Sequence, residues 1–278
     1  MSFAFIITSY NPGNFVLCTI KSILNQTYGD FEIIYLDDNS SDNSLELIYT
    51  IKDNRLKIYK NDTRKGLIFS LNLAISLTNC KYIIRFDSDD ILLPTFLETR
   101  LIHISEDLVL LGENILITDA NLKIISKTKF PTEDREIKNV LFNLKNSINQ
   151  PGILLKKDAV LAAGGYKEVE AAEDFDLWVR LIKHGKFKNT KTYLVLYRVT
   201  GNSLTNKTFK NIAKTMILSL SNYDNKSINS IQAKVFIKLY NYYNYKRGYS
   251  LTKLFYFPIY TLYRIILGFS IKHRFYKS

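Results

Sequence analysis

Acidic residues follow two short hydrophobic runs in the first third of the chain. Asp37–Asp38 closes the run 31–36, and the tetrapeptide Asp87–Asp90 closes the run 81–86. Carboxylates that share one crevice repel each other and raise one another's pKa values. A divalent cation relieves that repulsion, and carboxylate oxygens suit Mg²⁺ or Mn²⁺, which proteins usually share with substrate phosphates. The two segments therefore predict a metal site that also takes a phosphate-bearing ligand.

Turns and helix N-caps are the alternative explanation for both segments, because Asp, Asn and Ser are favoured there. Either segment alone is consistent with a cap. The site interpretation is favoured because both segments close a hydrophobic strand within the same alternating pattern.

A third acidic pair, Glu173–Asp174, precedes a stretch with Leu177, Trp178 and Leu181 on one face. This spacing predicts a helix that begins at Asp174 and buries one side. Negative charge is favoured at any helix start, so the pair by itself predicts only a charged N-terminus. Trp178 is expected in the core, with stacking on a sugar as the alternative.

The elements that must position these residues alternate between strand and helix over residues 1–95. Strands are predicted at 3–7, 31–36, 56–59 and 81–86, and helices at 14–26, 42–52 and 67–77. Such alternation with short connections predicts an α/β fold, with a mostly parallel sheet and helices on both faces. Ligands bind these sheets beyond the carboxyl ends of the strands, where the acidic segments lie.

Composition fits a globular protein with a real core. The chain has 278 residues, of which 46% are hydrophobic and 23% charged, which allows one large domain or two small ones and excludes disulfide and collagen scaffolds. Cys18 and Cys80 are expected to be reduced core residues. Segment 3–7 lacks the basic start of a signal peptide and is expected to be a buried strand. Further elements are predicted as a helix near 94–106, strands at 108–111 and 115–118, a segment at 150–155, a strand ending at 196–198 and helices at 209–220 and 231–245.

The strand ends resemble a known family in both residue type and order. The matching segments are Ile6–Pro12, Ser22–Tyr28, Phe31–Asp42, Lys65–Gly66 and Phe86–Asp90. They resemble the family 2 glycosyltransferases of GT-A fold, over about residues 3–200 and most specifically in the first 95. The resemblance implies a Rossmann-like sheet, a nucleoside-diphosphate sugar donor, usually a UDP-sugar, and inverting transfer to a hydroxyl acceptor in bacterial surface polysaccharide or lipopolysaccharide synthesis.

The resemblance also implies roles on the donor side of the site. Thr8 and Tyr10 would line the base and ribose, and Asp38 would hydrogen-bond the nucleobase. Asp87-Ser-Asp89 matches the family's DXD motif, in which Asp87 faces the ribose or metal and Asp89 holds Mn²⁺ or Mg²⁺ against the diphosphate. A bound cation offsets the negative charge that develops on the leaving group.

The metal carboxylate has a second candidate. Asp90 is an alternative ligand, because some relatives align this residue one position later. The family often has a His shortly after Tyr197-Arg198, and residues 199–203 contain none, which leaves the number of protein ligands open. Arg198 itself is expected either to reach the donor diphosphate or to form a surface ion pair.

On the acceptor side, the Glu-Asp pair follows a Gly-Gly-Tyr turn at 164–166, as in family members. The resemblance implies that Asp174 is the general base and that Glu173 helps it or contacts the acceptor. The implied reaction is a single displacement: Asp174 takes the proton as the acceptor oxygen attacks the anomeric carbon, and the diphosphate leaves from the opposite face.

Basic charge gathers at the end of the chain. Residues 206–278 carry a net charge of +12 and 16 aromatic residues, whereas 1–95 and 96–205 carry −2 and +2. The apolar segment 254–271 is borderline for a membrane span. Together with its basic flanks it suits a helix that lies in a membrane interface.

The charge distribution predicts a two-part organisation. Residues 1–205 would be the catalytic domain, with a donor-binding half at 1–95 and an acceptor-binding half at 96–205. The tail 206–278 would hold the protein on the anionic inner face of a bacterial membrane, on the cytoplasmic side, where the acceptor is a saccharide or a lipid-linked sugar. The alternative for the tail is a helical cap on the catalytic domain.

Two other functions remain open from the residues alone. A basic aromatic tail is also typical of nucleic-acid-binding proteins, although the acidic crevice argues against nucleic acid as the partner. A metal-dependent nucleotidyltransferase also joins a nucleotide site to metal-binding carboxylates. The Glu-Asp helix start favours transfer to a hydroxyl instead.

Overall fold

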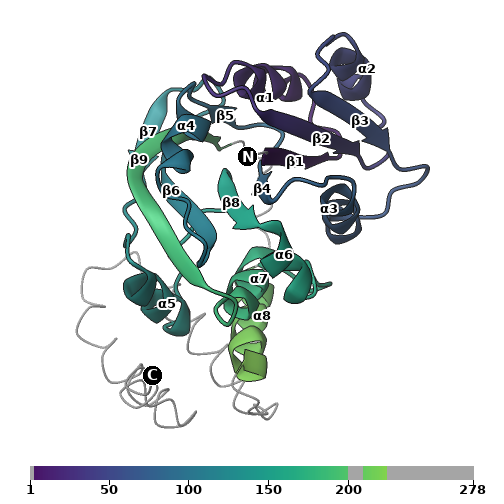
Figure 1. The fold of residues 1–278 in the computed structure, drawn as a ribbon. Helices are drawn as coiled ribbons and strands as arrows, with labels where there is room; N and C mark the ends of the chain where they lie inside the picture. Colours follow the sequence, from purple (N-terminus) through teal and green to yellow (C-terminus); the bar gives the residue numbers. More distant parts are fainter. Residues whose placement is uncertain (1–2, 200–208, 224–278) are drawn as a thin grey trace. The chain divides into compact units, whose positions relative to one another are not determined.

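The computed structural model describes residues 3–199 and 209–223. The chain divides into two compact units, one of residues 1–168 and 173–203, the other of residues 169–172 and 204–278. The first unit holds all the strands that the structure describes (Figure 1). The predicted helix at 231–245 and the apolar segment 254–271 lie outside the described residues.

The described part of the first unit is built on one nine-stranded sheet. Its strands are β1 (Phe3–Ser9), β2 (Phe31–Asp37), β3 (Leu56–Lys60), β4 (Tyr82–Arg85), β5 (Ile91–Leu92), β6 (Leu108–Thr118), β7 (Ile124–Lys127), β8 (Ile153–Lys156) and β9 (Lys186–Arg198). The order across the sheet is β3-β2-β1-β4-β8-β6-β9-β5, and β7 pairs with β6.

The sheet is mixed and mostly parallel. Strands β3, β2, β1 and β4 run parallel to one another, and β6 and β9 form a second parallel pair. Between them β8 runs antiparallel to both β4 and β6, which joins the two parallel blocks into one sheet. The predicted α/β fold is confirmed. The prediction of a mostly parallel sheet is also confirmed, and every antiparallel pair in the described sheet involves β5, β7 or β8.

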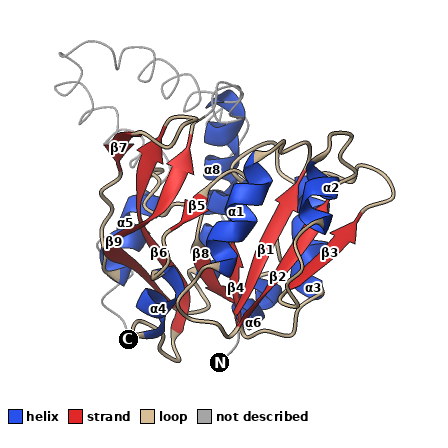
Figure 2. Ribbon diagram, turned by 90° about the horizontal axis from the view of Figure 1, so that it is seen from above, coloured by secondary structure: helices blue, strands red, loops and turns tan. Residues whose placement is uncertain are grey.

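Helices cover both faces of the sheet. They are α1 (Phe15–Leu24), α2 (Ser44–Tyr49), α3 (Leu67–Ser76), α4 (Phe96–Leu101), α5 (Asp134–Phe142), α6 (Lys157–Ala162) and α7 (Glu173–Leu181), with α8 (Phe209–Tyr223) in the second unit. Figure 1 shows α1 and α2 on one face of strands β1 to β3 and α3 on the opposite face. Figure 2 shows α1 in front of the strands.

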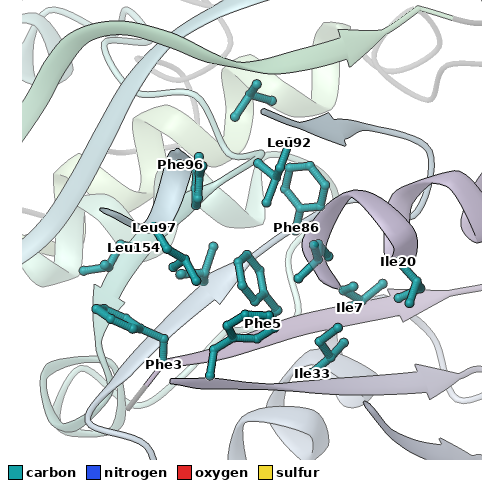
Figure 3. Packing of buried hydrophobic residues seen from close by; sticks show 14 of the residues in the cluster. Phe3, Phe5, Ile7, Ile20, Ile33, Phe86, Leu92, Phe96, Leu97 and Leu154 are labelled. Atoms are coloured by element: carbon teal, nitrogen blue, oxygen red, sulfur yellow. The ribbon is translucent and has the colours of Figure 1, made fainter. Parts of the chain in front are cut away.

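Strand β1 lies at the centre of the core. Phe3, Phe5 and Ile7 pack with Ile20 of α1 and with other residues of one hydrophobic cluster (Figure 3). The intervening residues of β1 are also buried, and the strand packs against α3 on its other face. A strand covered on both faces reads as a continuous hydrophobic run, which is the pattern at the start of the chain.

Strand β6 corrects one prediction. The sequence predicted separate strands at 108–111 and 115–118 with a break between them. The structure has one strand across both, because register shifts absorb the irregular middle and Glu113 forms a buried ion pair with Arg100 of α4 at 2.9 Å. The local pattern does not reveal this contact, because the counter-ion of Glu113 lies on another element.

The two cysteines differ in their surroundings. Cys80 is buried, as predicted, whereas Cys18 is exposed. The prediction for Cys18 was wrong because α1 buries a different face, formed by Val16, Thr19, Ile20 and Ile23. Trp178 of α7 is fully buried, which confirms the core prediction and excludes stacking of its ring on a sugar in this structure.

The second unit is described through one helix and a short segment. Helix α8 confirms the predicted helix at 209–220 and extends it to Tyr223. Within this unit, Lys214 of α8 forms an ion pair with Glu170. No helix within residues 3–199 and 209–223 is long and apolar enough to cross a membrane.

Candidate active site

The carboxyl ends of β1, β2 and β4 meet at one edge of the sheet. Ser9 at the end of β1 lies beside Asp37 at the end of β2, and the backbone N–H of Asp38 donates to the carbonyl of Ser9 at 2.8 Å. On the other side of β1, the N–H of Phe86 donates to the carbonyl of Ile6 at 3.1 Å. The parallel pairing therefore brings the segments after β1, β2 and β4 together, as the sequence predicted.

Asp38 is buried and holds the loop before α3. One carboxylate oxygen accepts from the Asn61 amide at 2.7 Å and from the N–H of Lys65 at 2.8 Å, and the other accepts from the N–H of Gly66 at 2.8 Å. Burial alone would raise the pKa of Asp38, but these hydrogen bonds lower it below its usual value. Gly66 has φ +90, a conformation that favours glycine. The loop therefore needs a glycine at the position whose N–H donates to the Asp38 carboxylate.

Tyr10 and Thr8 lie at the end of β1. Tyr10 is 42% exposed, and the guanidinium of Arg64 lies 3.9 Å from the centre of its ring. Thr8 is half-buried one position before Ser9, whose hydroxyl lies 2.6 Å from that of Tyr35. An exposed aromatic ring backed by a cation offers a flat face for a ligand ring. Sequence reasoning missed Arg64, which stands in the loop that Asp38 holds.

The acidic segment after β4 presents its carboxylates at different depths. Asp87 is partly exposed and forms an ion pair with Arg85. Asp89 is half-buried, and burial together with the charge of Asp87 raises its pKa to about 6. Asp90 is fully buried, and burial with the charges of Asp87 and Asp89 raises its pKa well above the usual value. Asp87 and Asp89 are thus the carboxylates open to a ligand.

Arg198 fixes this segment from the end of β9. Its backbone N–H donates to the Asp90 carboxylate, its Nε donates to the carbonyl of Asp89, both at 2.8 Å, and a terminal nitrogen donates to the carbonyl of Ala120. Its guanidinium lies 4.3 Å from the ring centre of Phe15. The side chain is 6% exposed, so the alternative of a surface ion pair was wrong. In this structure Arg198 positions the acidic segment.

The donor set fits a cation that a ligand helps to hold. Asp90 Oδ2 and Asp37 Oδ1 are buried and have no hydrogen-bond partner among the described residues. In the part of the chain that the structure describes, no three His, Cys, Asp or Glu side chains converge to form a metal site. Mg²⁺ commonly takes one or two protein carboxylates and completes its shell with substrate phosphates and water. The carboxylates of Asp87 and Asp89 match that arrangement.

Glu173 and Asp174 form the first residues of α7. Asp174 is half-buried, and its carboxylate accepts from the N–H of Phe175 at 2.7 Å. Burial and the charge of Glu173 raise the pKa of Asp174 to about 6. Glu173 accepts a hydrogen bond of 3.4 Å from the Gln150 amide. A half-buried carboxylate with a pKa near neutrality has the properties of a general base.

Arg85 joins the two acidic groups, and sequence reasoning missed it. Burial would lower the pKa of this guanidinium, but the charges of Asp87, Tyr166 and Glu173 raise it. Its charge in turn opposes the rise in the pKa values of Asp89 and Asp174. The structure therefore brings the segment after β4 and the start of α7 into one electrostatic site. The available signal was the arginine inside the hydrophobic stretch Tyr82–Phe86.

Comparison with known proteins identifies this arrangement. Residues 4–163 match the family described as "Glycosyl transferase family 2". The chain belongs to glycosyltransferase family 2. This result makes the protein a glycosyltransferase rather than a nucleotidyltransferase. The match covers β1 to β8, including the acidic segments after β2 and β4, and ends before Glu173.

Two curated relatives of this glycosyltransferase are glycosyltransferases of Escherichia coli. It is 34% identical to the O-antigen biosynthesis glycosyltransferase WbnJ of Escherichia coli over 71% of this chain and 80% of the relative. It is 30% identical to WfaP of Escherichia coli, a UDP-Glc:alpha-D-GlcNAc-diphosphoundecaprenol beta-1,3-glucosyltransferase, over 75% of this chain and 82% of the relative.

Solved structures confirm the fold of this glycosyltransferase. S. aureus TarS 1–349, in complex with UDP-GlcNAc, matches 86% of this chain and 71% of its own with a TM-score of 0.64 and 15% identity. The mannosyltransferase PcManGT of Pyrobaculum calidifontis, in complex with GDP-Man and Mn2+, matches 96% and 83% with a TM-score of 0.60 and 12% identity. Both likenesses support the expected GT-A fold.

Proposed function

We propose that this glycosyltransferase moves a sugar from a UDP-sugar to a hydroxyl of a lipid-linked saccharide, with inversion, in the assembly of a bacterial surface polysaccharide. The observation that carries the proposal is the position of Arg85, which forms an ion pair with Asp87 and whose charge also acts on Asp174, the candidate base. The names of WbnJ and WfaP support the acceptor class, and the UDP-GlcNAc complex of TarS supports the donor.

The nucleotide would bind at the ends of β1 and β2. Tyr10 offers an exposed ring, backed by Arg64, for stacking of the base, and Thr8 lies next to it in the chain. The carboxylate of Asp38 already accepts three hydrogen bonds from the loop before α3. Asp38 would therefore shape the base pocket chiefly by holding that loop, and would touch the nucleobase only with a lone pair that these bonds leave.

Asp89, with Asp87 beside it, would hold the Mn²⁺ or Mg²⁺ of the donor diphosphate. Asp89 is favoured over Asp90 because Asp90 is fully buried and one of its oxygens is bound to the N–H of Arg198. When bound, the cation would offset the negative charge that develops on the departing diphosphate. Arg85 limits the repulsion among these carboxylates and orients Asp87 by an ion pair.

Asp174 would act as the general base on the acceptor hydroxyl. With a pKa of about 6 it is mostly ionised at neutral pH and basic enough to take a proton as the acceptor oxygen attacks. Glu173 raises that pKa by its charge, and we propose that it helps Asp174 or contacts the acceptor. Since the attacking oxygen and the leaving diphosphate lie on opposite faces of the sugar, one displacement inverts the anomeric carbon.

We further propose that the reaction takes place at the cytoplasmic face of the inner membrane. A lipid-linked acceptor is confined to a bilayer, and the basic tail 206–278 would hold the enzyme there. The tail lies mostly outside the described residues, so this part of the proposal rests on sequence.

A thermal-shift screen tests the donor and the metal together. The intact chain is titrated with UDP-sugars and GDP-sugars, each with Mn²⁺, Mg²⁺ or chelator. A ligand at a hundredfold its Kd stabilises the folded state by about 2.7 kcal/mol, so the preferred donor is expected to give a clear shift. Asp89→Ala should lose the metal-dependent part of the shift, and Asp158→Ala, at an exposed helix start, should keep it. Equal stabilisation of Asp89→Ala and wild type would contradict the assignment.

A transfer assay tests the base. Asp174→Asn is expected to bind the donor normally and to lose roughly a hundredfold to ten-thousandfold in transfer rate, the usual contribution of general-base catalysis. Asp158→Asn is the matched control, since it makes the same change at the exposed start of α6. Wild-type turnover by Asp174→Asn would remove Asp174 from the mechanism.

A further inference from the structure

The hairpin of residues 118–129 exposes two adjacent apolar side chains. Ile124 and Ile125 of β7 are 57% and 62% exposed. Single exposed hydrophobic residues are ordinary, but neighbouring isoleucines on an edge strand invite unwanted pairing in water unless something covers them. Figure 2 shows β7 at the margin of the sheet, and no strand in the described ranges pairs with its outer edge.

A β-bulge accounts for this exposure. Ile117 pairs with Ser126 and Thr118 pairs with Ile124, which leaves Ile125 without a partner opposite it. A bulge disturbs the alternation of side chains and re-aims them. All four residues of β7 are exposed, so neither isoleucine contributes to the core. The hairpin therefore places two apolar side chains on the protein surface.

The same hairpin is positively charged. Lys123, Lys127 and Lys129 are all exposed. Asp119 is the one acid in 118–129, and its carboxylate accepts from the N–H groups of Asn121 and Lys123, both at 2.9 Å. Apolar side chains with lysines close by in the chain suit the headgroup region of a bilayer that contains anionic lipid, because the apolar groups can insert and the lysines can pair with lipid phosphates.

The base of the hairpin is fixed to the candidate active site. The N–H of Val199 donates to the carbonyl of Thr118 at 2.9 Å, and the guanidinium of Arg198 donates to the carbonyl of Ala120. Arg198 also binds the carbonyl of Asp89. A surface that held the hairpin would therefore lie near the donor-side acids.

We propose that the hairpin 118–129 docks on an anionic lipid bilayer, with Ile124 and Ile125 in the headgroup region and the lysines beside lipid phosphates. This proposal extends the proposed function. It rests on that function in one respect, because a lipid-linked acceptor would bring the enzyme to a bilayer. It belongs to the catalytic unit and is separate from the tail 206–278.

Local fluorescence quenching tests the hairpin in the full chain. Ile125→Trp and, as the matched control, Ile102→Trp place a reporter at exposed isoleucines, while native Trp178 is fully buried. Each variant is mixed with vesicles of phosphatidylglycerol and brominated phosphatidylcholine. We expect emission of the Ile125→Trp reporter to fall about twofold, as for a side chain within the interface, and the Ile102→Trp reporter to keep its emission. Adding Lys123→Ser and Lys127→Ser should reverse the fall.

Several results would overturn the proposal. One is equal emission of the two reporters while the chain still sediments with vesicles, since the tail alone then makes the contact. Another is a change at Ile125→Trp that depends on protein concentration without lipid, since a second copy then covers the edge. Vesicle binding is measured without donor or acceptor, so a failure of the proposed transfer reaction would appear separately, in the activity assay.

Discussion

Asp174 and Arg85 set the protonation chemistry of the site at the scale of single residues. Burial and Glu173 raise the pKa of Asp174 to about 6, and the positive charge of Arg85 opposes that rise. The balance matters because a base must be ionised at the working pH and still bind a proton well. Tyr166 adds to this environment, since its hydroxyl is buried without a hydrogen-bond partner and Glu173 and Asp174 help to raise its pKa.

The pH dependence of transfer follows from this pKa. Because the carboxylate of Asp174 is the active form, the rate is expected to rise with pH through about 6 and to level off above neutrality. Between pH 7 and pH 5 the rate should fall about tenfold, as the ionised fraction does. Initial rates at saturating donor, measured across that range, check this. A flat profile would contradict the role of Asp174.

Substitution of Arg85 is expected to move that profile. Arg85→Gln removes a charge that favours ionised Asp174, so the midpoint of the rate profile should shift to higher pH. Arg85→Lys keeps the charge and should retain a midpoint near that of the wild type. Circular dichroism confirms that both variants fold. An unshifted midpoint in folded Arg85→Gln would show that Arg85 does not couple the two acidic groups.

At the scale of elements, a buried ion pair allows β6 to continue as one strand through Glu113. The Arg100 and Glu113 side chains are 0% and 1% exposed, and the Glu113 carboxylate also accepts from Thr192 and from the N–H of Leu194. These contacts fasten α4, β6 and β9 to one another. They also fix the end of β9, where Arg198 holds the acidic segment.

Removal of one charge from this pair should destabilise the fold. Glu113→Gln leaves the Arg100 guanidinium buried without its counter-ion, which is expected to cost about 3–5 kcal/mol in the free energy of unfolding. Urea denaturation measures the change. Lys186→Gln, which breaks an exposed ion pair with Asp107, should leave the midpoint nearly unchanged. Equal midpoints for Glu113→Gln and wild type would mean that the pair does not stabilise β6.

At the scale of the whole molecule, charge and chemistry occupy different parts of the chain. The excess of +12 lies in residues 206–278, whereas the acidic site lies in the nearly neutral remainder. Each Lys or Arg near an anionic leaflet contributes on the order of 1 kcal/mol, so in the proposed function the tail would set where the enzyme works. The hairpin 118–129 would add a contact close to the site.

Liposome flotation tests the tail by itself. Residues 206–278 fused to a soluble carrier are expected to float with vesicles that contain phosphatidylglycerol and to be released by high salt, because screening weakens surface attraction. The carrier alone is the control. Absence of the fusion from the floating fraction would favour a helical cap on the catalytic domain instead.

Much of the fold was predictable because its signals are local. The run at 3–7 and the alternation of 31–36 with its flanking helices follow from hydrophobic periodicity, which the structure confirms. The predictions failed where a residue's environment depends on residues that are distant in the sequence. The runs 108–111 and 115–118 were predicted as two strands because the buried pairing of Glu113 with Arg100 is not visible in the local pattern. Cys18 was misplaced because only packing decides which face of α1 is buried.

The sequence by itself determined the family and the acidic segments at the strand ends, because residue types and short spacings carry both. Only the tertiary structure decided what those acids touch. Arg85 forms an ion pair with Asp87 and its charge also acts on Asp174 at the start of α7. Asp38 accepts hydrogen bonds from the loop before α3, and the backbone N–H of Arg198 donates to a carboxylate 108 positions away in the chain. Such contacts depend on how the sheet orders its strands, which no local pattern of residues specifies.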